Sequence, residues 1–391
     1  MPFSLDRPVW AVRLQFFISG FLFATWGVHV PTVRAHYDLD EQRLALTMLA
    51  AGVGALCGLA FAGRWVGRWG PQRVACLTGL VAALTVMALL ASGSWVLLLA
   101  TMCVFGAAGS VYDVAMNAGG AALEAASGRR LMSRFHALFS FGGMAGAAFG
   151  SALLRVQAPP VLHLVLTGVA AVAAVWWATR PALPDMSAAP AASESRHFGA
   201  GRGRGALWML GALAAIGLVA EGAMYDWSVL YMQRELGSEP ALSALAYASF
   251  SVAMGLARLV GDAARARWPA HRLMAGSALL AAAGMAVALA GRHPVLALVC
   301  FALVGLGLAN VIPVLFAAAS RLPGVPAANG IAVVSSLGYL GFMAGPPVIG
   351  FIAQHRSLTA GLMTVVVFAV LLAVAGARAL RPVPGPRLGS M

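Results

Sequence analysis

The sequence contains no lysine, few charged residues of any kind and only 4 cysteines. Charged residues make up 10% of the 391 residues, whereas a typical soluble domain has about 25%. Hydrophobic residues make up 61%, which is more than the interior of a soluble fold of this size can enclose. These proportions argue against an ordinary soluble enzyme, and the apolar content also excludes a disordered chain.

The scarcity of cysteine limits the chemistry further. Cys57, Cys76, Cys103 and Cys300 all lie in apolar segments and form no CxxC pair. They indicate small buried side chains, with neither a disulfide framework nor a metal site. The GRGRG run that begins at Gly201 follows no strand, so it does not predict a phosphate-binding loop. We therefore expect no metal and no nucleotide cofactor.

Because lysine is absent, the net charge of +13 comes from arginine. A sequence pI of about 11.0 is typical of nucleic-acid-binding proteins. Here the arginines occur in short clusters between apolar stretches and form no continuous basic face. We therefore expect no nucleic-acid partner.

Long apolar runs dominate the chain. A membrane-spanning helix needs about 20 mostly apolar residues. None of the runs alternates as a membrane β-strand does. The sequence predicts an all-α integral membrane protein whose twelve transmembrane helices cover residues 10–30, 43–63, 74–93, 95–121, 132–154, 160–179, 206–232, 241–261, 273–291, 294–319, 328–353 and 358–379.

The arginines also predict an orientation. If the N-terminus is cytoplasmic, 20 arginines, Arg258 among them, fall on the cytoplasmic side. The remaining 6 are Arg34, Arg43, Arg155, Arg234, Arg292 and Arg356. Cytoplasmic loops of membrane proteins are enriched in arginine, so we predict that both termini are cytoplasmic. The first apolar run lacks a small-residue cleavage site and is expected to stay as the first helix.

The sequence indicates two related halves. An Ala-, Ser-, Pro- and Gly-rich linker, residues 180–205, separates a predicted six-helix bundle at 1–179 from a second at 206–391. Similar residues recur at one constant offset, since Gly128, Ser140 and Gly142 coincide with Gly324, Ser336 and Gly338. Such internal repeats are typical of membrane transporters.

Glycines spaced four apart recur on several predicted helices. Gly142, Gly146 and Gly150 form one such stripe, and Gly54 with Gly58 and Gly341 with Gly345 form two more. These stripes predict close helix contacts. They suit either surfaces that slide during function or static packing.

The loop after the second predicted helix carries a recognisable motif. It reads GRWVGRWGPQR, and its residues Gly63, Gly67, Arg68, Gly70 and Arg73 resemble the loop motif of the major facilitator superfamily. In that family an aspartate stands where this chain has Gly67, and it helps to latch the cytoplasmic side closed. The resemblance therefore leaves that latch in doubt. The equivalent loop of the second half retains an acid, Asp262.

Four further segments extend the resemblance over nearly the whole chain. YDVAMNAGGAALE, LMSRFHALFSFGG, EGAMYDWSVLYM and GYLGFMAGPPVIG are similar to a poorly characterised branch of bacterial inner-membrane transporters related to the fucose permease. The resemblance implies two bundles that alternately open to each side of the membrane, and it implies a transporter rather than an enzyme.

Three acids lie well inside predicted spans, where an ionisable side chain is costly and is by default a functional candidate. Asp113 has Asn117 one helical turn away, on the same face. The fucose permease has an acid and an asparagine at the matching positions, and the resemblance implies that Asp113 is a proton-coupling residue. A structural ion pair, for example with Arg134, is the alternative.

The other two acids share the seventh predicted helix. Glu221 is the deeper one and is the second candidate for proton coupling. Asp226 is flanked by Tyr225 and Trp227, and a carboxylate between aromatic rings suits sugars and amines alike. We predict that these three residues bind substrate, although aromatic residues at the membrane interface are an equally good explanation for the rings.

His136 on the fifth predicted helix and Asn310 on the tenth are weaker candidates for substrate binding. Pro313 interrupts the tenth helix and frees backbone carbonyls there. Hydrogen bonding between helices would account for both polar residues equally well.

Together these observations predict a secondary transporter of the bacterial inner membrane. We expect the lipid bilayer and a small-molecule substrate as partners, a monomer, and no cofactor besides the proton gradient. Symport of a small polar metabolite such as a sugar is the leading expectation. Proton-driven export of an amphipathic or cationic compound is the alternative, and a non-transporting membrane sensor or assembly protein is the alternative of another class.

Overall fold

A computed structural model describes residues 6–129, 131–180, 204–323, 325 and 327–381 of the chain. The described part is almost entirely helical. The predicted linker at 180–205 lies largely outside the described residues, and Asp262 is described only as part of a helix, without its side chain.

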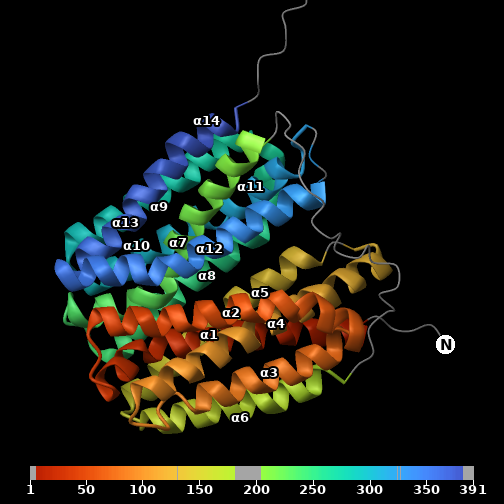
Figure 1. Cartoon of the computed structure of the whole chain (residues 1–391). Coiled ribbons are helices and arrows are strands. Elements are labelled where there is room, and N and C mark those ends of the chain that lie inside the picture. Colours follow the sequence, from red (N-terminus) through yellow and green to blue (C-terminus); the bar gives the residue numbers. More distant parts are fainter. Residues whose placement is uncertain (1–5, 130, 181–203, 324, 326, 382–391) are drawn as a thin grey trace, which may run out of the picture.

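The helices form two groups that lie one above the other in Figure 1. The first group, here called the N-half, comprises α1 (Asp6–His36), α2 (Glu41–Trp69), α3 (Pro71–Met87), α4 (Trp95–Ser127), α5 (Met132–Arg155) and α6 (Pro160–Ala178). The second, here called the C-half, comprises α7 (Arg204–Arg234), α8 (Pro240–Arg267), α9 (Ala270–Gly291), α10 (Pro294–Leu308), α11 (Val311–Ala319), α12 (Ala327–His355), α13 (Leu358–Leu371), a π-helical turn (Leu372–Gly376) and α14 (Ala377–Ala379).

These helices confirm the predicted membrane fold. Eleven helical segments of the described chain are long and apolar enough to cross a membrane, with α10 and α11 counted as one segment and α13 to α14 as another. The one remaining predicted span, 74–93, corresponds to α3, which is apolar but has only 17 residues. The predicted break in the tenth span is present, because the helix is interrupted at Asn310 and restarts as α11, where Pro313 has no backbone N–H to donate.

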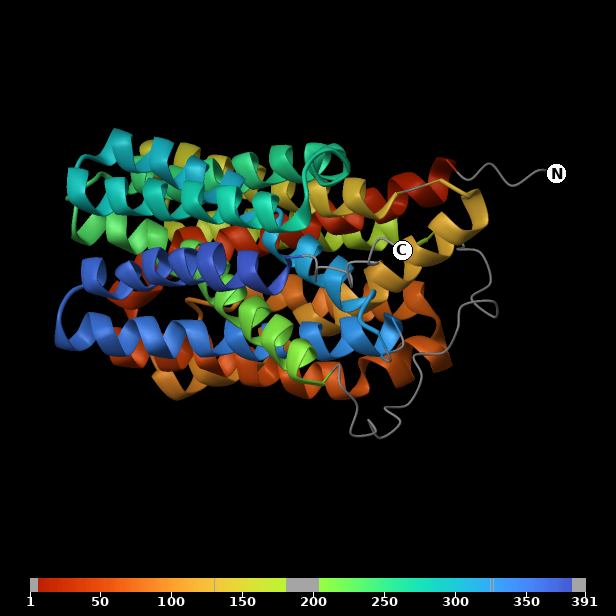
Figure 2. The ribbon, with the colours of Figure 1, turned by 90° about the horizontal axis from the view of Figure 1, so that it is seen from above.

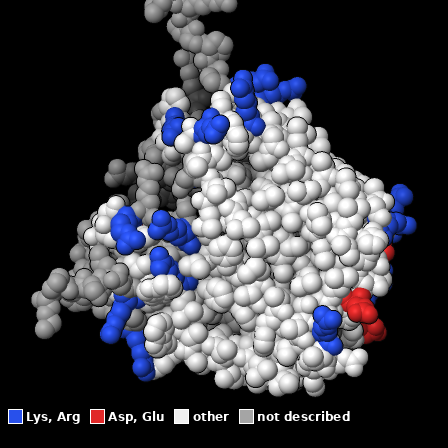
Figure 3. Space-filling view, turned by 180° about the vertical axis from the view of Figure 1, so that it is seen from behind, with Lys and Arg blue, Asp and Glu red and all other residues white. Residues whose placement is uncertain are grey.

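The distribution of charged and apolar side chains on the surface also fits a membrane protein. Figure 3 shows a broad belt without charged side chains, and the arginines gather toward its edges. Many large apolar side chains of the described residues are exposed, including Leu77, Val96 and Phe351 at 59%, 68% and 62%. Such a surface is stable only in contact with lipid, since soluble monomers rarely expose large apolar patches.

The glycine stripes pack helices of the same half together. A Cβ atom added at Gly142 of α5 would meet the carbonyl oxygen of Phe17 on α1. At Gly54 of α2 it would meet the carbonyl oxygen of Cys103 on α4, and at Gly341 of α12 it would meet α7. Because each contact joins two helices within one half, the stripes serve static packing. The alternative that these surfaces slide during function stays a prediction.

The two halves touch mainly through α5 with α8, α2 with α12 and α1 with α7. At the end opposite the N-terminus, Ser151 of α5 donates a hydrogen bond to the carbonyl of Ala241 on α8, at 2.7 Å. At the same end Glu41 of α2 forms ion pairs with Arg34 of α1 and with Arg234 of α7. The N-half and C-half are therefore bonded to each other at this end, here called the closed end.

The other end is richer in arginine and is here called the arginine-rich end. In Figure 1 the helices of the two halves lie close together at the left and diverge toward the right, and Figure 2 shows that α1 begins on that same side. Near this end of α2, a Cβ atom added at Gly63 or Gly67 would find nothing within 4 Å. The molecule is therefore wedge-shaped, with its halves joined at the closed end.

The packing predicts that two glycine-to-alanine changes affect the free energy of unfolding differently. Gly142→Ala should lower the free energy of unfolding by about 1–3 kcal/mol, because its Cβ atom forces α1 and α5 apart. Gly63→Ala should cause no loss, because its Cβ atom meets open space and alanine favours helix. Thermal unfolding of the detergent-solubilised variants measures both effects, and equal stability of the two would contradict this account of the stripe.

Candidate functional site

Asp113 and Glu221 lie near the middle of α4 and α7, in opposite halves of the molecule. The Nδ2 group of Asn117 donates to the Asp113 carboxylate at 3.1 Å and to the Asp113 carbonyl oxygen at 2.8 Å. The ion pairs found among the described residues involve Glu41 and Glu221, and Asp113 has no cationic partner in that part of the chain. The alternative of an Asp113–Arg134 pair is therefore wrong, and Arg134 lies exposed near the start of α5.

Glu221 is paired. Its Oε1 atom accepts a hydrogen bond from Arg258 of α8 at 3.1 Å, and the two side chains are 11% and 20% exposed. Arg258 also donates to the hydroxyl of Ser140 on α5, at 3.4 Å. One guanidinium therefore contacts both halves of the molecule at mid-membrane depth.

Arg258 was missed as a site residue because it was assigned to a cytoplasmic segment. That assignment is wrong, since α8 extends to Arg267 and Arg258 lies within the helix. The signal was present in the sequence, because the predicted span 241–261 already includes this residue. An arginine inside a span is as strong a functional indicator as an acid.

Two further side chains complete this group. Tyr339 of α12 is 46% exposed and lies within electrostatic range of both Asp113 and Glu221. His136 of α5 is exposed, lies within electrostatic range of Arg258 and packs edge-on against the ring of Phe16, with ring centres 5.2 Å apart. We call Asp113, Asn117, His136, Ser140, Glu221, Arg258 and Tyr339 the central polar cluster.

Tyr225, Asp226 and Trp227 lie closer to the closed end. Trp227 is completely buried, and the centre of the Tyr225 ring lies 5.0 Å from that of the Tyr247 ring, with the two rings tilted by 42°. The Asp226 carboxylate accepts a hydrogen bond from the indole of Trp26 on α1. Asp226 therefore joins α7 to the N-half, and the proposed contact of all three residues with substrate stays a prediction. The interface explanation does not fit Trp227, because a membrane-interface ring would be exposed.

Asn310 lies apart from the central polar cluster. It is 8% exposed, and its amide oxygen would be 2.8 Å from a Cβ atom added at Gly261 of α8. It thus occupies the space between α8 and the break that separates α10 from α11. Its role in substrate binding stays a prediction.

The loop motif forms the tight connection between α2 and α3. Gly70 is the single residue between the two helices, and its φ of +80° is a conformation that favours glycine. Arg68 and Arg73 are exposed. The surroundings of Gly67 are empty, so the position that carries the family's aspartate makes no contact with the C-half in this structure.

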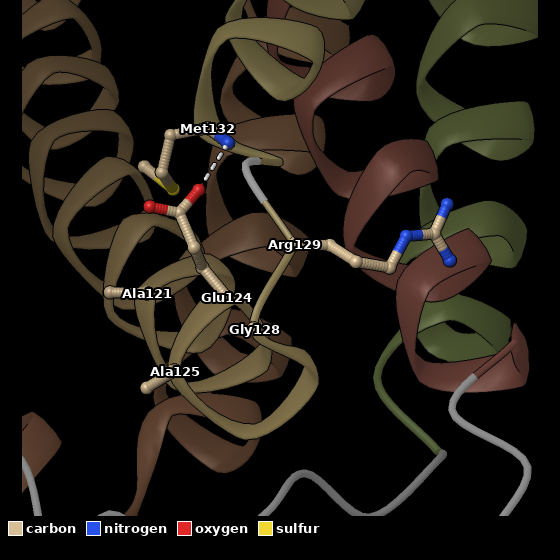
Figure 4. Close-up of a pocket in the computed structure, with 6 residues that line it drawn as sticks. All are labelled: Ala121, Glu124, Ala125, Gly128, Arg129 and Met132. Carbon is tan, nitrogen blue, oxygen red and sulfur yellow. Dashed lines mark hydrogen bonds between the residues drawn. The ribbon is translucent and has the colours of Figure 1, made fainter.

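A further acid, Glu124, lies at the arginine-rich end of α4. Figure 4 shows it beside a pocket of about 400 Å³ lined by Ala121, Glu124, Ala125, Gly128, Arg129 and Met132. The Glu124 carboxylate accepts backbone hydrogen bonds from Leu131 at 2.6 Å and Met132 at 3.0 Å. It therefore caps the start of α5, which is a structural role. The sequence did not indicate it, because the predicted span ended at residue 121.

Two helical halves that enclose acidic and basic side chains at mid-membrane depth define a polytopic membrane protein with a central polar site. A family model described as the Major Facilitator Superfamily matches residues 14–324 and, in a second alignment, residues 223–390. The chain belongs to this superfamily, as its loop motif predicted. It is a membrane transporter rather than an enzyme.

Relatives agree with this assignment. The chain is 35% identical over 369 residues to an uncharacterised MFS-type transporter of Yersinia pestis, and the match covers 94% of each protein. It is 31% identical to the membrane protein MosC of Rhizobium meliloti, over 93% of this chain and 88% of MosC. These names identify no substrate.

Solved structures share the fold. A D-xylose–proton symporter superposes with a TM-score of 0.78 at 13% identity, covering 95% of this chain and 96% of the symporter. A bacterial homologue of the human lysosomal transporter Spinster, in an inward-facing and unoccupied conformation, superposes with a TM-score of 0.75 at 15% identity, covering 98% and 100%. At such identities the likeness shows the fold alone.

The Arg258–Glu221 pair predicts a strongly non-additive mutational result. Arg258→Gln should lower the free energy of unfolding by about 3 kcal/mol, because it leaves the Glu221 charge unpaired. Adding Glu221→Gln should restore most of that loss. Thermal unfolding of the single and double variants measures the coupling.

Arg34→Gln is the matched control for this cycle. Its pair with Glu41 is at the closed end, and Glu41 keeps Arg234 as a partner, so a loss within about 1 kcal/mol is expected. A double variant no more stable than Arg258→Gln alone would show that the two side chains do not act as a pair.

Proposed function

We propose that this transporter couples the uptake of a small polar solute to the entry of protons. The observation that carries the proposal is the environment of Asp113, a half-buried carboxylate in the middle of a span that has no cationic partner among the described residues. An unpaired carboxylate in such surroundings is much less costly when protonated than when ionised. Moving between the two states changes the charge of the site by one, which a proton gradient can drive.

Asp113 interacts electrostatically with a residue of the other half. It belongs to the N-half, whereas Tyr339, which lies within electrostatic range of both Asp113 and Glu221, belongs to the C-half. Binding or loss of a proton there changes the electrostatic interaction between the halves. Glu221 is the second coupling candidate. Its ion pair with Arg258 stabilises the ionised form of Glu221, a stabilisation that Asp113 does not receive from a described residue.

The halves are joined at the closed end and diverge toward the arginine-rich end. We propose that the arginine-rich end faces the cytoplasm of a bacterial cell, since arginine is enriched in cytoplasmic loops. The structure then represents the inward-facing state of an alternating-access cycle, with the ion pairs of Glu41 closing the outer side. No partner subunit is needed for this cycle, and a monomer suffices.

Proton flux in proteoliposomes tests the coupling. D-Xylose, L-fucose and uridine serve as neutral uptake probes, D-gluconate and glycerol 3-phosphate serve as anionic uptake probes, and ethidium serves as the probe for export of an organic cation. We expect one of the uptake probes to cause proton entry in the native protein. We expect Asp113→Asn to abolish that entry, because an amide cannot carry the proton.

Asp38→Asn is the matched control for Asp113→Asn. Asp38 lies exposed in the connection between α1 and α2, and its positive φ of 48° is tolerated by asparagine. Its proton flux should equal that of the native protein. Proton entry that persists in Asp113→Asn would overturn the role of Asp113, and proton release coupled only to ethidium would favour the export alternative.

The proposed orientation makes a separate prediction. In a variant without its native cysteines, Gln157→Cys, in the connection between α5 and α6, should react with a membrane-impermeant maleimide in intact cells. Arg129→Cys, in the connection between α4 and α5, should react only after the membrane is permeabilised. Both positions are exposed at opposite ends of α5, so the reverse pattern would invert the topology.

A further inference from the structure

The Arg258 guanidinium has unused hydrogen-bonding capacity. An arginine carries five N–H donors in a planar fork. In this structure the described partners of Arg258 are one oxygen of Glu221 at 3.1 Å and the hydroxyl of Ser140 at 3.4 Å. The side chain is 20% exposed although it lies within a span. Part of the fork therefore faces space from which a ligand can approach.

The neighbours of Arg258 are also hydrogen-bond donors. His136 lies one helical turn before Ser140 on α5, is exposed and has no described hydrogen-bond partner. It lies within electrostatic range of Arg258. An imidazole, a hydroxyl and a guanidinium, drawn from both halves, thus converge on one place.

The charges of the cluster depend on Asp113. Arg258 contributes one positive charge, and Glu221 and Asp113 contribute one negative charge each when ionised. With Asp113 ionised the central polar cluster is therefore net negative and repels an anion. When Asp113 is protonated the cluster is neutral, and an anion can bind the free N–H groups of Arg258 without that repulsion.

We propose that the central polar cluster is an anion-binding site, and that the solute carries a carboxylate or phosphate group held by Arg258 and His136. This inference rests on the proposed proton coupling and adds the substrate class to it. A proton on Asp113 precedes the anion, so that one proton and one carboxylate monoanion cross together without net charge, whereas a phosphate monoester dianion crosses with one net negative charge. The anion bridges α5 and α8, and its arrival and departure alter a contact between the halves.

Neutral and cationic solutes fit the cluster less well. A neutral sugar leaves the guanidinium fork unused, and burying such donors without partners costs free energy. An organic cation would be attracted by ionised Asp113 but repelled by Arg258. These two classes are the competing outcomes of the test.

Thermal-shift and equilibrium-binding measurements on the purified full-length protein test the site without requiring transport. The probes share carbon skeletons and differ in charge. They are D-glucose, D-gluconate, D-glucose 6-phosphate and D-glucosamine, with glycerol, L-lactate and glycerol 3-phosphate as a three-carbon series and uridine with uridine monophosphate as a nucleoside pair. Within at least one series, we expect an anionic member to bind at least about tenfold more tightly than the neutral member. The carboxylate and phosphate members distinguish the two anionic groups.

Two variants locate the binding. The double variant Arg258→Gln/Glu221→Gln keeps the cluster's formal charge balance and should bind the anionic probe at least about tenfold more weakly. Arg34→Gln, which removes an arginine at the closed end, should bind it as the native protein does. If the double variant binds the anion unchanged, Arg258 is not the ligand.

The pH dependence tests the order of binding. In the native protein the affinity for the anionic probe should fall by up to about tenfold per pH unit as Asp113 loses its proton. In Asp113→Asn the affinity should be independent of pH over the same range. His136→Ala should weaken binding but keep the pH dependence of the native protein, which separates the two titratable groups.

The proposal is overturned if no anionic probe stabilises the protein, if neutral members bind as tightly as anionic members, or if D-glucosamine alone binds. This outcome is distinct from a failure of proton coupling. Proton entry together with tight binding of a neutral sugar would leave the proposed function in place and remove the anion site. Tight anion binding without proton flux would leave the anion site in place and remove the proposed proton coupling.

Discussion

A charge inside a membrane must be paired, neutralised or hydrated, and this constraint organises the middle of the molecule. Glu221 is paired with Arg258, Asp113 is hydrogen bonded to an amide, and Asp226 accepts a hydrogen bond from an indole. The three acids thus meet the same requirement in three ways. Only the pairing of Glu221 supplies a full opposite charge. Asp113 and Asp226 have hydrogen bonds without an opposite charge, so the cost of burying each of them depends on its protonation state.

The same constraint separates structural polar groups from functional ones. His29 and His163 are both buried in the N-half and bond each other at 2.7 Å, so each ring supplies the other's partner. Glu124 is satisfied by backbone N–H groups at the start of α5. These groups have their partners within one half. The central polar cluster differs because its contacts cross between the halves.

Contacts between the halves are unevenly distributed along the membrane normal. Hydrogen bonds and ion pairs link them at the closed end, and the bond from Arg258 to Ser140 links them near the middle. The glycine stripes make each half a tightly packed unit, because a side chain at those positions would meet backbone of the same half. Two rigid units joined over part of their length can rock about the joined part, which is how alternating access exposes a central site to one side at a time.

The amino-acid sequence by itself determined the membrane fold, since apolar runs of about 20 residues have few other stable arrangements in water or lipid. The approximate positions of the spans, the break near Asn310 and the loop motif at Gly63 to Arg73 all followed from local patterns. Several span ends did not, since α4 extends to Ser127, beyond the predicted residue 121. Asp113 could also be singled out, because an acid within an apolar run is conspicuous without knowledge of its neighbours.

Only the tertiary structure decided which of those polar residues meet. It paired Glu221 with Arg258, excluded the pair of Asp113 with Arg134, and placed Asp226 in the contact between the halves. The partners come from different helices, and their distances depend on how the helices are packed and rotated. Periodicity in the sequence shows which face of a helix a residue occupies, but the helix opposite that face is set by the packing of the whole chain.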